Sequence, residues 1–303
     1  MTLNRRTLGK SEIELSEISL GTMSLPNDST QSKRIIETAI EKGINYYDTA
    51  DLYAFGENER MVGELIKERR SDLVLGTKGG NHFEEGKDGW FWDPSKAYLK
   101  EACKNSLKRL GTDYIDLYQL HGGTIDDPID ESIEALQELK QEGTIREFGI
   151  SSIRPNVIRE YLHSGMASVM MQYSLLDRRP EEELLELLRQ NGIGVLVRGA
   201  VAKGLLTDRV EEKVSDDGFL GHSKERILFA TDALRAISDV ATPSQEAIRY
   251  VLRHPAVTSV VAGASTAEQV LENSVTSELG PLSDENYDKL KKSAEMIYYE
   301  QHR

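Results

Sequence analysis

Eight short apolar runs alternate with longer amphipathic segments along this chain, and that alternation constrains the fold more than any other feature. Runs that are apolar throughout are typical of strands buried on both faces. They lie near residues 17–21, 44–48, 72–77, 115–119, 145–150, 168–172, 193–198 and 258–262. Strands that alternate with helices form parallel sheets, so this pattern predicts an α/β fold of the TIM (β/α)8 barrel type.

The segments between the runs have the spacing of amphipathic helices, and several end at a glycine such as Gly43 or Gly111. The predicted helices include 30–42, 57–69, 95–110, 129–142, 155–164 and 181–190, with an extra C-terminal helix near 284–299. Residues 5–16 are short enough for an N-terminal β-hairpin. No linker or low-complexity tract interrupts the chain, so we expect one domain over residues 1–303.

Charge and cysteine content exclude several classes of protein. The formal net charge of −14 opposes general nucleic-acid binding, and an anionic ligand would need a local basic patch, which makes a neutral or cationic substrate the simpler expectation. Cys103 is the single cysteine, so an internal disulfide and a cysteine-rich metal site are excluded. No run approaches the roughly 18 apolar residues of a membrane span, and the N-terminus lacks an apolar signal segment, so we expect a cytoplasmic protein.

Four polar residues stand where predicted strands end. Asp48 closes the run INYYD, Lys78 follows VLGT, and His121 follows IDLYQL, while Tyr53 lies on the loop after Asp48. In a parallel barrel the carboxyl ends of the strands meet at one face, and that face carries the active site. The positions therefore predict an enzyme whose site contains all four side chains.

The four side chains are chemically complementary. A tyrosine phenol, with an ordinary pKa near 10, is a poor proton donor at neutral pH, but a neighbouring ammonium stabilises the phenolate. Lys78 could supply that charge and Asp48 could hold it by an ion pair, while His121 could hydrogen-bond a substrate oxygen. Taken singly, each has an ordinary structural role: Asp48 as a cap, Tyr53 in packing, Lys78 as solvated charge, His121 as a loop histidine. Together at one rim they favour a site that protonates a developing alkoxide.

Several segments resemble the signature sequences of the aldo-keto reductases. They are DTADLYAFGENE (48–59), VLGTKGG (74–80), LYQLHGG (117–123) and GISS (149–152), within a resemblance that runs from LGTM (20–23) through GLLT (204–207) to VVAGASTAEQVLEN (260–273). It implies a TIM barrel that transfers hydride from a nicotinamide cofactor to a carbonyl without a metal. It also implies a catalytic tetrad of Asp48, Tyr53, Lys78 and His121, with Tyr53 as the general acid.

The resemblance further implies where the cofactor binds. Ser151, Ser152 and Gln172 would hold the nicotinamide carboxamide at the ends of the fifth and sixth strands. After the last strand, Ser265 and Gln269 would bind a 2′-phosphate at a helix start, and Glu272 with Asn273 would hold adenine, unless this segment is only a capped surface helix. The cofactor would then be NADPH. Further residues expected around it are Gly21, Thr22, Gly199, Gly204, Leu206 and Gly263.

Two departures from the family pattern concern charge. Many relatives carry a basic residue in the segment 265–273, where this chain has none, so Lys203 or Arg209 would have to help, although each could equally be a solvated surface charge. Where relatives usually read YSPLA after the seventh strand, this chain reads RGAVA, and Arg198 replaces an aromatic ring stacked on the nicotinamide. Its charge would oppose the oxidised, cationic ring, so we expect the reduced cofactor to bind preferentially.

Aromatic residues on the expected catalytic face suggest a substrate pocket. Trp90, Phe91 and Trp92 lie in the insertion 79–93, and Phe55 lies near Tyr53. These rings could form an apolar wall, for which we single out Phe55, Trp90 and Trp92, or they could only pack on the barrel rim. A second insertion covers 207–223. The sequence thus predicts an NADPH-dependent reductase of aldehydes or ketones. No sequence feature indicates an oligomeric state.

Two other functions are compatible with parts of the sequence. One is an NADPH-binding redox sensor or regulatory subunit, as potassium-channel β-subunits of similar sequence suggest, and an added partner-binding segment, which is not evident, would favour it. The other is a lyase or aldolase that uses Lys78 as a Schiff-base amine. Asp48 and the cofactor-site match favour a lysine that stays charged and non-nucleophilic.

Overall fold

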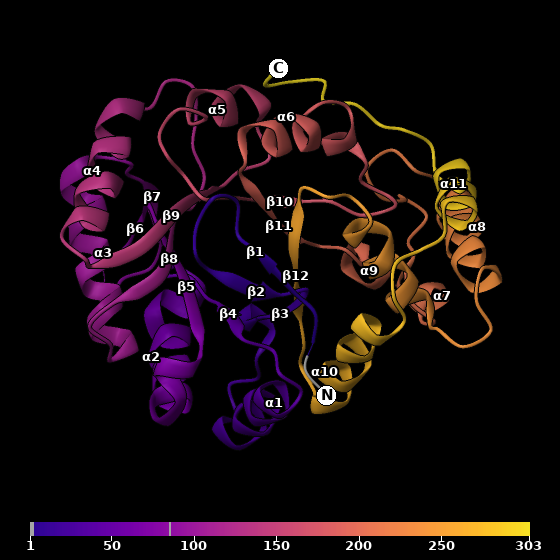
Figure 1. The fold of residues 1–303 in the computed structure, drawn as a ribbon, viewed down its shortest axis with the longest axis horizontal. Coiled ribbons are helices and arrows are strands. Elements are labelled where there is room, and N and C mark those ends of the chain that lie inside the picture. Colours follow the sequence, from indigo (N-terminus) through magenta and orange to yellow (C-terminus); the bar gives the residue numbers. More distant parts are fainter. Residues whose placement is uncertain (1–2, 85) are drawn as a thin grey trace.

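The computed structural model of the chain describes residues 3–84 and 86–303, and its centre is a closed barrel of parallel strands. The eight strands are β3 (Ile18–Gly21), β4 (Tyr46–Asp48), β5 (Val74–Gly79), β8 (Ile115–Leu120), β9 (Ile145–Ser151), β10 (Ser168–Gln172), β11 (Gly194–Arg198) and β12 (Val257–Gly263). The last strand pairs with the first, with Gly263 beside Gly21, and this pairing closes the barrel (Figure 1). The (β/α)8 fold predicted from the apolar runs is confirmed, and each strand overlaps its predicted run.

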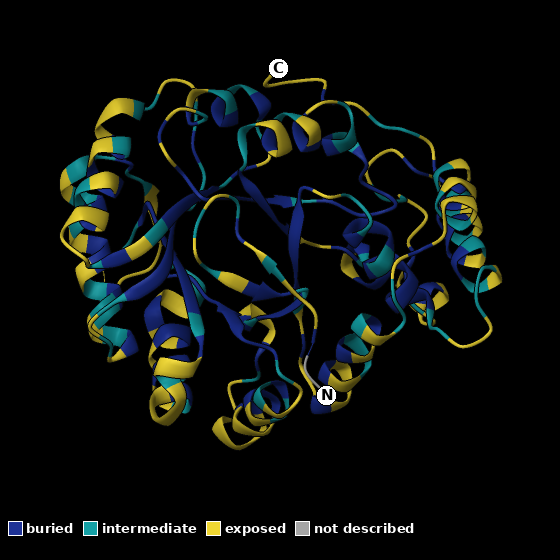
Figure 2. Ribbon diagram, viewed as in Figure 1, coloured by how far each residue is buried: buried dark blue, intermediate teal, exposed yellow. Residues whose placement is uncertain are grey.

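A ring of helices packs outside the barrel. It contains α1 (Ser29–Glu41), α2 (Glu57–Ile66), α3 (Lys96–Leu110), α4 (Ile129–Gln141), α5 (Pro155–Glu160), α6 (Leu184–Asn191), α9 (Pro243–Leu252) and α10 (Ala267–Val275). Their inward faces are buried and their outward faces exposed (Figure 2). Local signals set their ends: the Asp28 carboxylate accepts hydrogen bonds from the amides of Thr30 and Gln31 before α1, and Gly111 ends α3 with a φ of 62°.

The N-terminal hairpin closes the barrel's amino-terminal end. β1 (Arg5–Thr7) and β2 (Glu14–Ser16) pair antiparallel, as predicted for residues 5–16. Leu8 and Leu15, on either side of the turn, are fully buried and pack in one cluster with Tyr46. These apolar side chains fill the amino-terminal part of the barrel interior, and the polar residues of the candidate site lie at the opposite end.

Several helices differ from the sequence predictions. The C-terminal helix α11 (Asp284–Ser293) ends six residues before the predicted 299, since Arg178 donates hydrogen bonds from Nη1 to the carbonyls of Lys291 and Ala294, each at 3.0 Å. The Lys291 carbonyl would otherwise accept the next helical amide. Similarly, α5 ends at Glu160 rather than 164, and α6 begins at Leu184 rather than 181.

A second layer of helices follows β11. It comprises the short α7 (Val210–Lys213) and α8 (Lys224–Ala236), which packs against α9 and α11 (Figure 1). Neither α8 nor α9 is among the predicted helices, although α9 begins with a capping box formed by Thr242 and Gln245. No helix within 3–84 and 86–303 combines the length and apolar character needed to cross a membrane.

Candidate active site

The four predicted catalytic residues meet at the carboxyl-terminal end of the barrel. Asp48 is the last residue of β4, Lys78 lies near the end of β5, and His121 follows β8. Lys78 Nζ donates hydrogen bonds to Asp48 Oδ2 at 2.5 Å and to the carbonyl of Thr49 at 2.7 Å, and it lies 3.4 Å from the Tyr53 hydroxyl. The rings of Tyr53 and His121 lie edge to face, 5.9 Å between centroids.

Side chains inside the barrel hold Asp48 in place. The Tyr46 hydroxyl donates a hydrogen bond to Asp48 Oδ1 at 3.0 Å, and Gln119 Nε2 approaches the same oxygen at 3.5 Å. Tyr46 precedes Asp48 by two residues, so strand alternation places both on the interior face. A Cβ at Gly76 would lie 2.2 Å from the Tyr46 hydroxyl, so glycine there makes room for this ring.

The Lys78 and Asp48 pair is fully buried and charged. Burial alone would lower the pKa of Lys78, but the Asp48 carboxylate beside it raises that pKa above its ordinary value. Burial raises the pKa of Asp48, and the Lys78 ammonium acts against that rise. The ammonium, whose pKa is raised, therefore stays protonated beside the Tyr53 hydroxyl.

His121 is neutral in this site. Burial lowers its pKa to about 3, with help from the positive charges of Lys78 and Arg198. Its Nδ1 atom is buried and has no hydrogen-bond partner within the described residues. A neutral imidazole carries one donor and one acceptor, so His121 can orient a carbonyl oxygen by a hydrogen bond but does not add a charge.

The turn that presents Tyr53 has an uncommon backbone. Ala54 and Phe55 have φ values of 48° and 50°, a region that costs a side-chain-bearing residue on the order of 1–2 kcal/mol. Nearby, Glu59 is buried, accepts a hydrogen bond from Thr77 at 2.5 Å and pairs with Arg109 at 2.6 Å. These contacts fix the start of α2, to which the turn leads.

A cavity of about 600 Å³ opens beside Tyr53 and His121. Its lining includes Trp90 and Trp92, two of the three residues singled out for the substrate, whereas their neighbour Phe91 is exposed and does not line it. Phe55, the third, does not line it. Phe55 is 41% exposed and its ring packs edge-on against Phe83, 5.6 Å between centroids, because the left-handed backbone at 54–55 directs it there.

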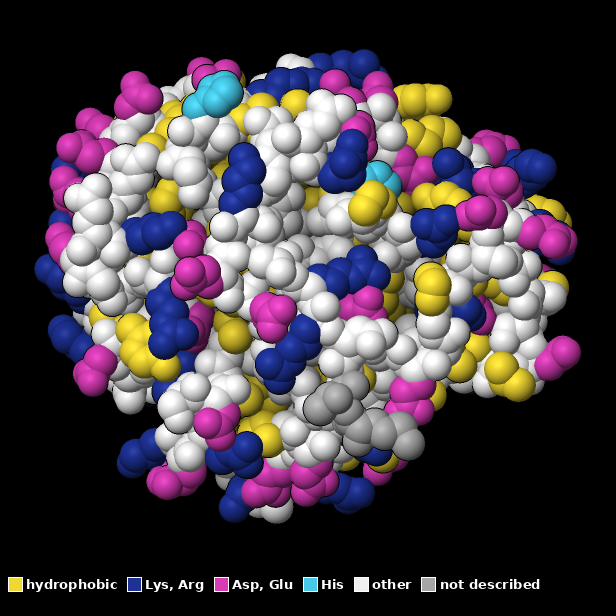
Figure 3. Space-filling model, viewed as in Figure 1, with side chains coloured by type: hydrophobic (Ala, Val, Ile, Leu, Met, Phe, Trp, Pro, Cys, Tyr) yellow, Lys and Arg dark blue, Asp and Glu magenta, His cyan; other side chains and the backbone are white. Residues whose placement is uncertain are grey.

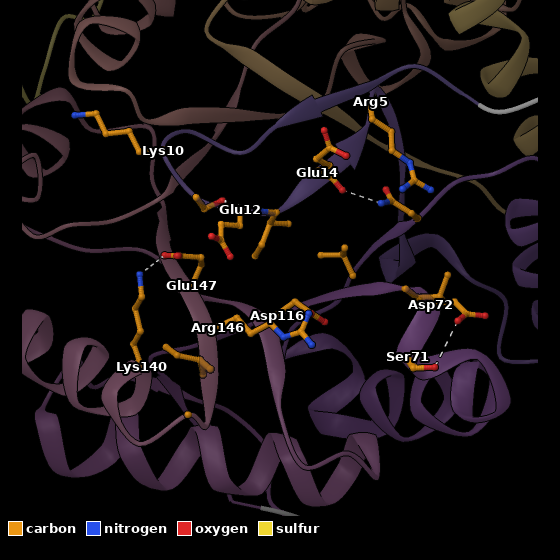
Figure 4. A pocket seen from close by; sticks show the side chains of 17 residues that line it. Arg5, Lys10, Glu12, Glu14, Ser71, Asp72, Asp116, Lys140, Arg146 and Glu147 are labelled. Carbon is orange, nitrogen blue, oxygen red and sulfur yellow. Dashed lines mark hydrogen bonds and ion pairs between the residues drawn. The ribbon is translucent and has the colours of Figure 1, made fainter.

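A second cavity, of about 770 Å³, lies at the opposite end of the barrel beside the N-terminal hairpin (Figure 4). Its lining mixes charges of both signs, among them Arg5, Glu14, Asp116 and Arg146. Basic and acidic side chains are also interspersed over the whole face of the molecule seen in Figure 3. None of the four predicted catalytic residues, Asp48, Tyr53, Lys78 and His121, lines this second cavity. The chemistry suggested by these four residues therefore belongs to the cavity of about 600 Å³ beside Tyr53 and His121.

Of the three groups predicted for the nicotinamide, the two serines line the cavity, whereas Gln172 does not line it and is linked to it through Arg198. Ser152 Oγ accepts a hydrogen bond from the amide of Arg154 at 3.2 Å, whereas the Ser151 hydroxyl makes no hydrogen bond with any described residue. Gln172 accepts a hydrogen bond from Arg198 Nη1 at 3.0 Å and donates one from Nε2 to Asp177 at 2.8 Å. One amide hydrogen of Gln172 is left. A free hydroxyl and a free amide hydrogen fit the acceptor and donor atoms of a carboxamide.

The groups predicted for the adenosine end lie around the start of α10. Gln269 Oε1 accepts hydrogen bonds from the amide and the hydroxyl of Ser265, at 2.7 and 3.2 Å. Glu272 accepts from Thr242 at 2.9 Å and from Ser244, while Asn273 is half-buried. The exposed Ser265 and Gln269 beside the amino-terminal end of α10 fit a phosphate, whereas Glu272 already has protein partners.

The remaining predicted residues differ in what they can offer. Lys203 is exposed and has no ion pair within the described residues, whereas Arg209 pairs with Glu212 at 2.7 Å. Thr22 is buried, with its hydroxyl 2.9 Å from the Asp48 carbonyl, and the Leu206 side chain belongs to the hydrophobic core, so only main-chain atoms of Leu206 could reach a ligand. The glycines lie at strand ends or in turns: Gly21, Gly199, Gly204 and Gly263.

Sequence reasoning missed part of the cavity lining. Met23, Asn81, Arg154 and Met170 also line it. Two of them carried a positional signal: Arg154 follows the segment GISS by two residues, and Met170 precedes Gln172 by two on β10, hence on the same strand face.

Comparisons with known proteins agree with this geometry. The model of the Aldo/keto reductase family matches residues 17–295. The solved holo form of the aldo-keto reductase AKR11C1 from Bacillus halodurans is 52% identical, with a TM-score of 0.94 over 99% of both chains. The uncharacterized oxidoreductase YqkF of Bacillus subtilis is 50% identical over 99% of this chain and 100% of its own length. The NADH-specific methylglyoxal reductase of Escherichia coli is 32% identical over 96% of this chain and 98% of its own length. This chain belongs to the aldo/keto reductase family of oxidoreductases.

Proposed function

We propose that this protein is an NADPH-dependent oxidoreductase that reduces aldehydes or ketones to alcohols, with Tyr53 as general acid. The observation that carries the proposal is the position of Lys78 Nζ, 2.5 Å from the Asp48 carboxylate and 3.4 Å from the Tyr53 hydroxyl. A buried ammonium held in that place stabilises the phenolate left when the tyrosine gives up its proton.

The side chains have distinct roles in this proposal. His121, which is neutral, donates a hydrogen bond that orients the substrate oxygen, and Tyr53 transfers its proton to that oxygen. The bound cofactor supplies the hydride that reduces the carbonyl carbon. In the reverse direction Tyr53 accepts the proton of the alcohol. Trp90 and Trp92 shield the carbonyl from water on the open side of the cavity.

Support for NADPH over NADH comes from the start of α10. Ser265 and Gln269 are exposed there, next to the amino-terminal end of the helix, and Lys203 is a cation without a carboxylate partner within the described residues. An NADH-specific relative at 32% identity shows that the family does not fix this choice. We therefore assign the 2′-phosphate preference to these three side chains.

The test is the loss of NADPH absorbance and, separately, of NADH absorbance with a panel of aldehydes and ketones. We expect Tyr53→Phe to reduce turnover by about 10²–10⁴-fold, because the proton donor is lost. Tyr114→Phe is the matched control: its ring lies between Arg70 and Arg146, far from the tetrad, and phenylalanine keeps that stacking. Near-normal turnover in Tyr53→Phe would refute the proposal.

A different outcome would favour the redox sensor. If the protein binds NADPH tightly but oxidises it with no carbonyl in the panel, then cofactor binding without turnover is the better description. If Lys78 instead becomes covalently linked to a carbonyl substrate upon borohydride treatment, the site works through a Schiff base.

A further inference from the structure

We propose that the carbonyl substrate carries an anionic group, best a carboxylate, and that Arg154 binds it. This inference rests on the proposed reductase function and names its substrate class. It reverses the expectation from net charge, because an acidic protein repels anions except where local cations compensate. Such a local excess of cations exists in the cavity beside Tyr53.

Arginines without an ion pair are uncommon in this protein. Among the described residues every arginine contacts a carboxylate except Arg5, Arg154 and Arg198. Two of these three line the same cavity. The chain has a formal charge of −14, so carboxylates are plentiful. Two arginines without a carboxylate partner in one cavity therefore indicate a site for an anion.

No carboxylate in the described cavity lining offsets the two guanidinium groups. The neighbouring acidic residues lie behind the lining and are already bound. Asp127 accepts hydrogen bonds from Trp92 at 3.0 Å and from Thr124 at 2.7 Å, and Asp177 is held by two bonds from Arg179. The cavity therefore has a net positive lining, since His121 is neutral.

Arg154 is placed to make a direct contact. It precedes α5 at the cavity rim, and its Nη1 donates a hydrogen bond to the carbonyl of Gly123, also a lining residue, at 2.5 Å. This bond uses one of its five N–H donors and fixes the plane of the guanidinium. The remaining donors are free within the described residues and suit a carboxylate, which a guanidinium can bind through two parallel hydrogen bonds.

The positive lining is not the binding site predicted for the cofactor phosphates. The residues predicted to contact phosphate, Lys203, Arg209, Ser265 and Gln269, do not line this cavity. Arg198 is bonded to Gln172, one of the residues predicted for the nicotinamide, and adds to the positive potential, whereas the Arg154 guanidinium is bonded, among the described residues, only to the carbonyl of Gly123 and keeps its other donors free. The direct contact with the substrate anion is therefore assigned to Arg154.

A matched pair of substrates tests the proposal in the complete enzyme with NADPH. 4-Carboxybenzaldehyde and its uncharged amide, 4-formylbenzamide, differ in charge but little in size. We expect the acid to have a kcat/KM at least about tenfold above the amide, and Arg154→Gln to remove most of that ratio while the amide is still reduced. Arg154→Lys should retain part of it, because it keeps the charge.

Arg5→Gln is the matched control. Arg5 is the third arginine without an ion pair, and it lines the cavity at the other end of the barrel (Figure 4), so its loss changes net charge equally. It should leave the acid-to-amide ratio unchanged. A wild-type ratio at or below one, or the same ratio in wild type and Arg154→Gln, would overturn the inference while leaving the reductase proposal intact.

A binding measurement separates failure of this inference from failure of the proposed function. Trp90 and Trp92 are the only tryptophans in the chain and both line the cavity, so intrinsic fluorescence reports its occupancy. With NADP⁺ bound, 4-(hydroxymethyl)benzoate should bind more tightly than its amide, and Arg154→Gln should remove the difference. Equal binding of the two would refute anion recognition, whether or not the protein turns over any aldehyde.

Discussion

Arg198 donates a hydrogen bond from Nη1 to Oε1 of Gln172, at 3.0 Å. Gln172 is held in turn by Asp177, which is fully buried and bound by two hydrogen bonds from Arg179, at 2.7 and 2.8 Å. The Arg179 guanidinium lies 5.1 Å from the ring of Tyr299, beyond the last helix. Arg198 is thus a fixed charge at the part of the site where we propose that the nicotinamide binds, and it is oriented by contacts that reach the C-terminal segment.

A fixed cation at that place should discriminate between the two oxidation states of the cofactor. The oxidised nicotinamide is positively charged and the reduced ring is neutral, so we expect NADPH to bind more tightly than NADP⁺. Replacing Arg198 with glutamine should bring the two dissociation constants closer by about tenfold, because the repulsion is lost. Isothermal titration of both forms measures this, and Arg198→Lys should keep most of the difference. Equal affinities in the wild type would remove the idea.

Replacements in the buried pair of Lys78 and Asp48 can distinguish its effect on stability from its effect on catalysis. Lys78→Met leaves the Asp48 carboxylate buried without its ion pair, so we expect a loss of about 3–5 kcal/mol in the free energy of unfolding, together with loss of turnover. The double replacement Asp48→Asn with Lys78→Met removes both charges and should regain most of the stability. It should not regain turnover, because the ammonium beside Tyr53 is absent. Urea unfolding and NADPH oxidation measure the two quantities, and recovered turnover in the double variant would contradict the role given to Lys78.

The barrel could be predicted from the sequence because its strands are buried on both faces and therefore read as continuous apolar runs. The end of the last helix could not. α11 stops at Ser293 because Arg178, more than a hundred residues earlier, binds the carbonyls that a longer helix would need. A contact between residues so far apart leaves no trace in local periodicity.

The tetrad could be predicted for a related reason: strand ends and their spacing place Asp48, Lys78 and His121 on one rim. Arg154 was not predicted as a site residue, because its own segment does not show that its side chain reaches Gly123 on the preceding βα loop. The closeness of Phe55 to Tyr53 in the sequence predicts a place in the substrate pocket. In the structure, the positive φ values of the turn bring the Phe55 ring against Phe83 instead, and the sequence does not reveal those φ values.

The low pKa of His121 predicts how the enzyme responds to acid. Its folded-state pKa of about 3 lies below the ordinary value of 6.5, so the unfolded chain binds the proton more readily. Stability linked to His121 is therefore full above about pH 6.5 and is lost as the pH falls toward 3. We expect wild type to lose about 2 kcal/mol more than His121→Gln between pH 6.5 and 4.5, measured by urea unfolding. Identical losses in the two proteins would show that His121 is not buried in its neutral form.

The choice between NADPH and NADH should depend on Lys203 more than on Arg209. Both lie near the start of the second insertion, but Arg209 pairs with Glu212 at 2.7 Å, whereas Lys203 contacts no carboxylate within the described residues. A cation without a partner can approach a phosphate without first breaking an ion pair, so its charge is available to the cofactor.

We therefore expect Lys203→Ala to weaken NADPH binding by about tenfold and to leave NADH binding nearly unchanged, since only NADPH has the 2′-phosphate. Arg209→Ala removes the same charge from the same loop and should have the smaller effect, which makes it the matched control. Fluorescence titration of NADPH and NADH with wild type and both variants gives the change in each dissociation constant. If the two variants weaken NADPH and NADH equally, the 2′-phosphate is not recognised by this loop, and the preference must come from Ser265 and Gln269 at the start of α10.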